Sequence, residues 1–254
     1  MAQIITIANQ KGGVGKTTTT AALADGLTKR GYKVLQIDLD GQGNLSYTAR
    51  ADANGLTSLE LLHGKATAKE AIQHTEAGDI IAASPNLAGS DKDLSGSGAD
   101  KRLKEALEPM RSEYDFIIID APPSLSILTI NAITAADNLI ITAQADIYSL
   151  QGIGQLYSTI RAIQRTTNKG LKIAGILLTR YNGRAVLTRD LTDIAEQTAA
   201  QLKTKIFNAK IREGIAVKEA QASGQSVLTY SPRSNPARDY SDFIEELLKD
   251  LKQG

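Results

Sequence analysis

The sequence has no cysteine among its 254 residues. It can therefore form neither a disulfide bond nor a thiolate-bound metal site or iron–sulfur cluster, and it fits a reducing cytosol. Histidine is scarce as well, because only His63 and His74 could supply an imidazole. These two residues flank a short helical pattern over residues 56–74, and their spacing matches no zinc site, so we interpret both as surface residues. We expect a cytoplasmic protein without a thiol or zinc centre.

The sequence also lacks a long apolar run and has no basic leader before its first apolar strand pattern, which starts at Ile4. We therefore expect neither an export signal nor a membrane-spanning helix. An amphipathic helix over residues 236–254 could still lie on a membrane or pack onto the protein. Helices that bind membrane surfaces are rich in Lys and Arg, whereas acidic residues outnumber Lys249 and Lys252 here, so we expect packing. The apolar face of this helix comprises Tyr240, Phe243, Ile244, Leu247, Leu248 and Leu251.

The sequence has almost no net charge, because it contains 29 Lys and Arg and 28 Asp and Glu. The charges are unevenly distributed along the chain, however. Residues 151–220 contain 12 basic and 5 acidic residues, whereas residues 1–150 contain 13 basic and 18 acidic residues. The C-terminal third therefore has a basic sector, which is either an ordinary solvated face or a surface for an anionic partner.

Apolar, β-branched runs alternate with longer amphipathic segments along the chain. Near-continuous apolarity indicates strands that are buried on both faces, as in a parallel sheet. Strands joined regularly by helices predict a doubly wound α/β fold, with a mostly parallel sheet flanked by helices. No linker or internal repeat divides the chain, so we expect a single domain over residues 1–254. The predicted strands are 3–8, 33–38, 79–84, 116–121, 138–143 and 172–179, and the predicted helices are 16–30, 100–110, 126–136, 149–166 and 186–202.

The loop KGGVGK, residues 11–16, lies between the first predicted strand and a predicted helix. Glycines allow main-chain N–H groups to surround a phosphate, and the N-terminus of the next helix favours the same anion. Lys16 could reach the β- and γ-phosphates of a nucleotide, and the Thr17 hydroxyl could bind Mg²⁺. The loop departs from the usual pattern, because Gln10 replaces its first glycine and an additional lysine, Lys11, follows. The predicted nucleotide-binding residues of the loop are Gly12, Gly13, Val14, Gly15, Lys16, Thr17 and Thr18.

Three carboxylates follow predicted strands and are expected at the same edge of the sheet as the loop. Asp120 ends the apolar run FIIID and could hold a magnesium ion through water, as a Walker B aspartate does. Asp38 and Asp40 lie at the end of the strand over residues 33–38 and just beyond it. Either of these two could orient an attacking water, and either could instead cap a turn.

These segments together resemble a known family. The stretches KGGVGKTTTTAALADGL (11–27), QIDLDGQGNLS (36–46), DFIIIDAPPSLSILTINAITAAD (115–137) and LLTRYN (177–182) are similar to those of the ParA/Soj partition ATPases. That family belongs with the MinD proteins to the deviant Walker A group of P-loop ATPases. The resemblance implies ATP and Mg²⁺ as cofactors.

The resemblance also implies individual roles. In that family the additional lysine, matched by Lys11, crosses to the other subunit of an ATP-dependent homodimer and contacts the partner's phosphates. Lys11, Lys16 and Asp40 then form the catalytic set, with Asp40 as the hydrolysis residue. Magnesium is expected at Thr17, Asp40 and Asp120.

Two further features concern loops around the nucleotide. Arg180, Tyr181 and Asn182 match a segment that closes over the adenine base in relatives, and we predict contacts of Arg180 and Asn182 with the nucleotide. The family usually has a proline where this sequence has Gly41. We expect a more flexible loop there, which could change the basal turnover.

The family binds DNA without sequence preference through Lys and Arg of its C-terminal region, and salt weakens such binding. Arg184 matches one DNA-contacting arginine of the family. The position of a second one is occupied by Ala216, and neighbouring basic residues could substitute for it. The resulting DNA-binding candidates are Arg184, Lys203, Lys205, Lys210, Arg212 and Lys218.

The resemblance therefore predicts a DNA-partition ATPase in the cytoplasm, associated with the nucleoid and stimulated by a ParB-like centromere-binding partner. The alternative is a MinD-type ATPase that cycles on the membrane and regulates cell division, which the acidic C-terminal helix disfavours. A metabolic synthetase with the same loop would need a substrate pocket beside the γ-phosphate and turnover that is independent of DNA.

Overall fold

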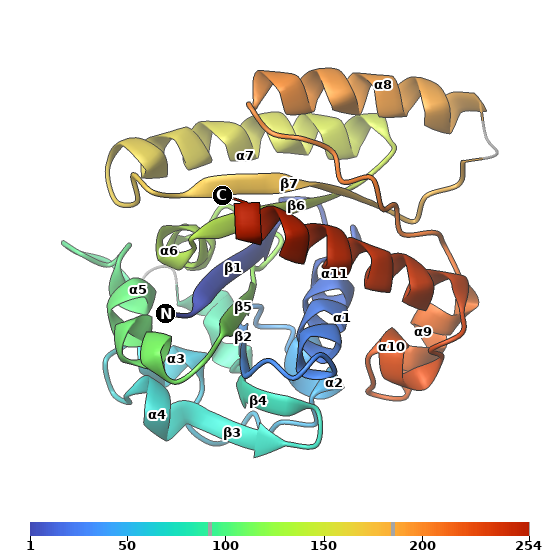
Figure 1. Ribbon diagram of the computed structural model, residues 1–254. Coiled ribbons are helices and arrows are strands. Elements are labelled where there is room, and N and C mark those ends of the chain that lie inside the picture. Colours follow the sequence, from blue (N-terminus) through green and yellow to red (C-terminus); the bar gives the residue numbers. More distant parts are fainter. Residues whose placement is uncertain (91–92, 184–185, 254) are drawn as a thin grey trace.

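A twisted β-sheet forms the centre of the molecule (Figure 1). The computed structural model describes residues 1–90, 93–183 and 186–253, and within these residues the sheet has seven strands in the order β3-β4-β2-β5-β1-β6-β7. All neighbouring strands are parallel except β3 and β4, which are antiparallel. The strands are β1 (Gln3–Ala8), β2 (Val34–Asp38), β3 (Ile72–Thr75), β4 (Gly78–Ile81), β5 (Phe116–Asp120), β6 (Asn138–Gln144) and β7 (Lys172–Thr179).

The predicted parallel sheet is confirmed, since a strand occurs at each of the six predicted places. Strand β3 was not predicted, because it is short, half-exposed and without a continuous apolar run. The helical pattern over residues 56–74 is wrong in its second half. The left-handed Gly64 (φ 68°) separates two short helices, a capping box between Thr67 and Glu70 starts the second of them, and the chain then turns into β3.

Helices cover both faces of the sheet (Figure 1). The described helices are α1 (Lys16–Thr28), α2 (Asn44–Thr48), α3 (Ser58–Leu62), α4 (Ala68–Ala71), α5 (Arg102–Leu107), α6 (Ile127–Ala135), α7 (Ile147–Arg165), α8 (Val186–Gln201), α9 (Ile215–Ala222), α10 (Val227–Tyr230) and α11 (Asn235–Gln253), with 3₁₀ turns η1 (Pro85–Gly89) and η2 (Glu108–Ser112). The helices predicted from the sequence are confirmed, although the one over residues 100–110 consists of α5 followed by η2.

Successive side chains of the buried strands point to opposite faces of the sheet and belong to two hydrophobic cores, one on each face. In β1, Ile4 belongs to the core that also contains residues of α3, α5, α6, α7 and α8, whereas its neighbour Ile5 belongs to the core with residues of α1, α9, α10 and α11. Ile117 and Ile118 divide in the same way in β5. Burial on both sides explains why these strands read as continuous apolar runs rather than as alternating patterns.

The C-terminal helix α11 packs onto the body of the protein, as its acidic polar face predicted. Tyr240, Phe243, Ile244 and Leu247 are buried in the core shared with α1. Contact between the two helices is close, because a Cβ atom added to Gly26 of α1 would lie 2.3 Å from Cδ1 of Ile244. In the part of the chain that the structure describes, no helix is both long and apolar enough to span a bilayer.

Candidate nucleotide-binding site

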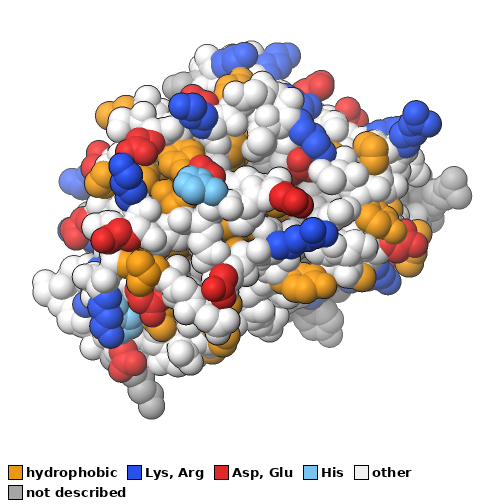
Figure 2. All heavy atoms as spheres, turned by 90° about the horizontal axis from the view of Figure 1, so that it is seen from below, with side chains coloured by type: hydrophobic (Ala, Val, Ile, Leu, Met, Phe, Trp, Pro, Cys, Tyr) orange, Lys and Arg blue, Asp and Glu red, His pale blue; other side chains and the backbone are white. Residues whose placement is uncertain are grey.

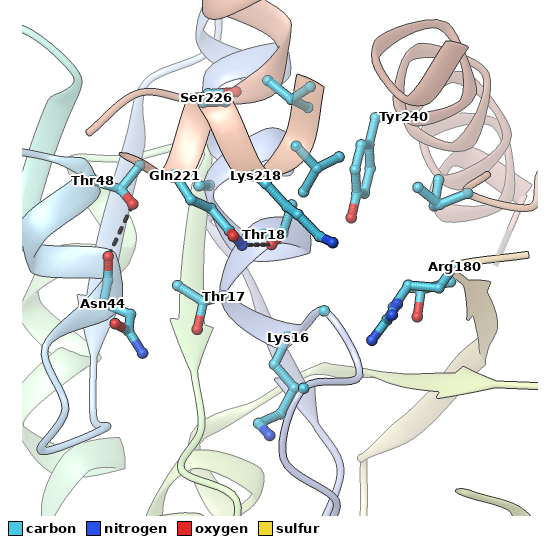
Figure 3. Close-up of a pocket in the computed structure, with 18 of the residues that line it drawn as sticks. Lys16, Thr17, Thr18, Asn44, Thr48, Arg180, Lys218, Gln221, Ser226 and Tyr240 are labelled. Atoms are coloured by element: carbon cyan, nitrogen blue, oxygen red, sulfur yellow. Dashed lines mark hydrogen bonds between the residues drawn. The ribbon is translucent and has the colours of Figure 1, made fainter. Parts of the chain in front are cut away.

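A cavity of about 460 Å³ opens at the carboxyl ends of the parallel strands, beside the N-terminus of α1. Doubly wound sheets bind their ligands at this edge. One end of the cavity is formed by the loop before α1, with Lys16 and Thr17, and by Asp40 after β2. The other end is formed by α9 and α10, from which Lys218, Gln221 and Ser226 face the opening (Figure 3).

The loop before α1 has the backbone shape of an anion-binding loop. Gly13 and Gly15 adopt left-handed conformations (φ 75° and 81°), which residues with a side chain rarely accept. Gly15 is the N-cap of α1 and supplies no side-chain cap, and the first turn of α1 contains no acidic residue. The positive end of the helix dipole and its N–H groups are therefore available to an anion in the cavity.

Neighbouring strands hold this loop in place. The hydroxyl of Thr179, at the end of β7, donates a hydrogen bond of 2.9 Å to the carbonyl oxygen of Val14. The amide of Gln144, at the end of β6, donates one of 2.9 Å to the carbonyl oxygen of Gly13. Because both anchors use loop carbonyl oxygens, the carbonyls point toward the protein and the N–H groups remain for the ligand.

Lys16 is positioned inside the cavity. Its side chain is only 7% exposed, and its Nζ donates a hydrogen bond of 3.2 Å to the carbonyl oxygen of Lys11. Burial lowers the pKa of Lys16, and the charges of Asp120 and Asp40 oppose this shift. The two carboxylates thus partly offset the cost of burying the Lys16 ammonium group.

Asp38 and Asp120 lie side by side in the register of β2 and β5, and both are fully buried. The carboxylate of Asp38 accepts hydrogen bonds from the Ser46 backbone N–H (2.8 Å), the Ser46 hydroxyl (2.8 Å) and the Asp40 backbone N–H (3.0 Å). Asp38 thus holds the loop between β2 and α2 in shape. This is the turn-capping role that the sequence left open for Asp38.

Asp120 has the properties of a metal ligand. Burial, followed by the nearby charge of Asp38, raises the pKa of Asp120 to about 8. One carboxylate oxygen accepts a weak hydrogen bond of 3.4 Å from Thr20, whereas the buried Oδ2 has no hydrogen-bond partner among the described residues. An unpaired buried carboxylate oxygen is unfavourable unless a cation or water binds it. Thr17 and Asp40 line the cavity, and Asp120 lies buried behind the Thr17 hydroxyl, so that together these oxygen donors fit Mg²⁺.

The substitution Asp120→Asn should stabilise the nucleotide-free protein, and the gain should grow with pH. In the folded state the pKa of Asp120 is about 8, whereas in an unfolded chain it is about 3.9. A raised folded-state pKa means that stability is lost as the pH rises through this window, because the carboxylate ionises while buried. We expect a melting temperature about 4 °C or more above wild type at pH 8.5 and a smaller difference at pH 5.

Thermal melts without nucleotide or magnesium, at both pH values, measure this effect. Asp242→Asn serves as the control, because Asp242 is an exposed carboxylate on α11. A melting temperature of Asp120→Asn that stays below that of wild type at pH 8.5 would contradict a destabilising effect of the ionised, buried Asp120.

Asp40 differs from Asp38 because it lines the cavity. Its carboxylate accepts one hydrogen bond from the described residues, of 3.1 Å from the backbone N–H of Gln42, and thus keeps oxygen atoms for other partners. The next residue, Gly41, is closely packed, since a Cβ atom there would lie 3.0 Å from the backbone nitrogen of Ala88 in η1. The structure therefore gives a packing reason for glycine at this position, in addition to the expected flexibility.

Lys11 points away from the cavity of its own chain. Its Nζ donates hydrogen bonds of 2.8 and 2.7 Å to the two carboxylate oxygens of Asp146 and lies 3.3 Å from the hydroxyl of Ser149. Hydrogen bonds from Lys11 and Ser149 outweigh the effect of burial and lower the pKa of Asp146. Among the described residues that line the cavity, Lys11 does not occur.

The predicted adenine contacts are only partly placed at the cavity. Arg180 lines it, with a left-handed backbone (φ 49°) and an ion pair of 2.9 Å to Glu213. Asn182 is exposed, and the part of the chain described around the cavity does not include it in the lining. Tyr181 instead donates its backbone N–H to the Ile211 carbonyl oxygen. Sequence patterns missed the wall that α9, α10 and α11 contribute, namely Val217, Gln221, Gln225, Ser226, Val227 and Tyr240.

The predicted DNA-binding residues fall into three groups. Lys205 and Arg212 form ion pairs with acidic residues of α11, at 2.7 Å to Glu246 and 2.5 Å to Asp239. Lys218 lines the nucleotide cavity, and Lys210 lies 5.0 Å above the ring of Tyr181. Lys203 is exposed, and Arg184 lies outside the described residues.

The basic sector is thus partly neutralised within the chain. Acidic residues beyond residue 220 supply the countercharges, which a count over residues 151–220 does not include. Figure 2 shows the side of the molecule away from α7 and α8, where Lys and Arg are interspersed with Asp and Glu. Lys205 and Arg212 are thus paired within the chain and Lys218 lies at the nucleotide cavity, while a role of the three in DNA binding stays a prediction.

Comparison with known proteins agrees with this site. The model of the AAA domain family matches residues 2–173. The sporulation initiation inhibitor protein Soj of Bacillus subtilis is 38% identical over 253 residues, covering 97% of this chain and 98% of Soj. The chromosome partitioning protein ParA of Myxococcus xanthus is 34% identical over 252 residues, covering 97% of this chain and 88% of ParA.

Among solved structures, cobyrinic acid a,c-diamide synthase from Mycobacterium smegmatis, crystallised with ADP and magnesium, matches with a TM-score of 0.86. It is 33% identical, and the match covers 100% of this chain and 97% of that one. The parallel sheet and the glycine loop before α1 are those of a P-loop nucleotide-binding protein. Within that class, the chain belongs to the Soj/ParA family of chromosome-partitioning proteins, as its sequence motifs predicted.

Proposed function

We propose that this chain is a Mg²⁺-dependent partition ATPase that works as an ATP-bound homodimer. The dimer binds nucleoid DNA in the cytoplasm without reading its sequence, and a ParB-like partner stimulates hydrolysis. The observation that carries the proposal is the position of Lys11. This lysine belongs to the phosphate-binding loop, yet its ammonium group is bound by Asp146 outside the cavity of its own chain.

Because Lys11 does not line the described cavity of its own chain, it is available to the nucleotide in the cavity of a second copy. Its side chain is 32% exposed, so it lies at the surface where another copy could meet it. A cation delivered by a partner offsets phosphate charge only after two chains have closed, as an arginine finger does. ATP would thereby hold the dimer together, and hydrolysis would release it.

The remaining residues account for binding and hydrolysis of ATP. The N–H groups of the loop and Lys16 hold the β- and γ-phosphates, while Thr17, Asp120 and Asp40 would hold Mg²⁺. Bound magnesium neutralises charge on the β- and γ-phosphates. Asp40 orients a water for attack on the γ-phosphorus, the bond from that phosphorus to the β–γ bridging oxygen breaks, and ADP and phosphate leave. The ADP and magnesium in the related synthase structure support this choice of ligands.

The test compares wild type with Lys11→Ala in ATP, in ADP and without nucleotide. We expect wild type to dimerise and to be retained on DNA only with ATP. Lys11→Ala should remain monomeric. The amount of this variant retained on DNA should be about tenfold lower than that of wild type at equal salt, because a monomer makes fewer contacts with DNA phosphates than a dimer does. Light scattering after size exclusion measures the assembly, and a DNA-coated surface measures retention.

Lys29→Ala is a matched control, since Lys29 is also an ion-paired lysine, 3.0 Å from Asp25 on α1. This variant should behave as wild type in both assays. Equal retention of Lys11→Ala and wild type on DNA in ATP would count decisively against the proposal.

The similarity to a synthase favours a second candidate, an ATP-dependent synthetase. That enzyme would turn over ATP with a small-molecule substrate and without any response to DNA. ATPase assays with and without DNA and the product of the neighbouring gene separate the two functions. A MinD-type membrane cycle is disfavoured by the burial of the apolar face of α11, and sedimentation with liposomes in ATP would reveal it.

A further inference from the structure

Helix α9 closes one end of the nucleotide cavity and is fixed there by packing. Ala216 and Ala220 are buried in the core below it. At the start of the helix, Gly214 approaches α11 so closely that a Cβ atom would lie 2.8 Å from Cγ of Pro236. The face of α9 that lines the cavity, with Val217, Lys218, Ala220 and Gln221, is therefore held in a defined orientation.

That face carries Lys218 and Gln221, which are three residues apart and hence neighbours on the helix surface. Gln221 donates a hydrogen bond of 2.9 Å to the hydroxyl of Thr18, in the first turn of α1. Both side chains line the cavity, and the ammonium group of Lys218 points into it, on the side of Thr18 and Arg180 (Figure 3).

Lys218 differs from other cations in this region because its charge is not neutralised internally. Arg180 is paired with Glu213, and Arg212 is paired with Asp239. Lys218 is exposed, and its ammonium group has neither an ion pair nor a hydrogen bond with the described residues. An unpaired cation that faces a cavity is poised for an anionic ligand.

We infer that Lys218 binds the nucleotide, at the phosphate next to the ribose. This inference rests on the proposed ATP site and adds a residue to it. Lys16 serves the β- and γ-phosphates at the deep end of the cavity, and the loop N–H groups surround the α- and β-phosphates. Thr18 lies two residues after Lys16 in α1, and its hydrogen bond with Gln221 shows that this part of α1 faces α9. Lys218 of α9 would therefore lie nearer to the α-phosphate than to the β- and γ-phosphates.

This assignment replaces the DNA contact that the sequence predicted for Lys218. The α-phosphate is present in both ADP and ATP, so the lysine should contribute equally to both complexes. A residue that contacts DNA would instead change DNA retention at saturating nucleotide and leave nucleotide affinity unchanged.

The experiment titrates Lys218→Gln with Mg-ADP and with Mg and a non-hydrolysable ATP analogue, in the absence of DNA. We expect Kd for both nucleotides to rise about tenfold, by the same factor, because one charge-assisted hydrogen bond is lost. Lys218→Arg should restore the affinity to within about threefold of wild type, since it keeps the charge. Lys203→Gln is the control, because Lys203 is exposed and outside the cavity lining, and its Kd should equal that of wild type.

Each other outcome is decisive. An unchanged Kd for ADP overturns the inference, whether or not DNA retention falls. Weaker binding of the ATP analogue alone also overturns it, because the lysine would then serve the γ-phosphate. Failure of wild type itself to bind either nucleotide would refute the proposed ATPase rather than the role of Lys218, and circular dichroism shows whether each variant is folded.

Discussion

Asp40→Ala should slow ATP hydrolysis by about 100-fold or more while ATP remains bound, because the residue that orients the attacking water is lost. The carboxylate of Asp40 lines the cavity and accepts one hydrogen bond from Gln42 among the described residues, so it has oxygen atoms left for water. Asp38, in contrast, is occupied by Ser46 and by the Asp40 backbone. We therefore expect the variant to accumulate the ATP-bound form. Phosphate release in a single turnover and titration with an ATP analogue measure the two effects separately.

Gln42→Ala is the matched control for Asp40→Ala, since Gln42 lines the same cavity from the same loop. Its hydrolysis rate should stay within about threefold of wild type, because it supplies no charged group to the reaction. A rate for Asp40→Ala close to that of Gln42→Ala would move the water-orienting role to another carboxylate, with Asp120 as the next candidate.

Lys16→Ala should weaken the binding of ADP and ATP by about 100-fold or more, since a buried cation directed at the phosphates is removed. The loss should exceed that of a surface lysine, because Lys16 is 7% exposed and water screens it little. Burial lowers the pKa of Lys16 against the opposing effect of Asp120 and Asp40, so the phosphates gain a partner that is already desolvated. Calorimetric titration with Mg-ADP measures the affinity.

Lys11→Ala provides the comparison within the same loop. Lys11 is bound to Asp146 and does not line the described cavity, so its removal should leave the affinity for ADP within about threefold of wild type. If the two variants lost the same affinity for ADP, the division of labour between these lysines would be wrong.

The parts of the fold and site that the sequence predicted are those encoded locally. Strands such as β1 and β5 are buried on both faces, so their apolar runs are visible without any knowledge of neighbours. The loop around Gly13 and Gly15 is equally local, because positive φ angles and the start of α1 belong to consecutive residues.

The parts that were missed depend on segments distant in the sequence. Gln221, in the cavity wall, is 203 residues away in the sequence from its hydrogen-bond partner Thr18. No local sequence pattern reveals that the two residues are in contact. The pairing of Arg212 with Asp239 and of Lys205 with Glu246 likewise joins segments that a local charge count separates. Strand β3 escaped prediction because pairing with β4, rather than its own composition, makes it a strand.

In the proposed ATP-bound dimer, the ion pair between Lys11 and Asp146 would set a threshold for assembly. Lys11 cannot reach a second chain without leaving two hydrogen bonds of 2.7 and 2.8 Å, so its transfer is an exchange of one anion for another. A carboxylate offers one negative charge, whereas a triphosphate offers several at close spacing, and only the denser anion favours the exchange. If the proposed dimer forms, Asp146 competes with the triphosphate of a second copy for Lys11, and it would favour the single chain until ATP is bound.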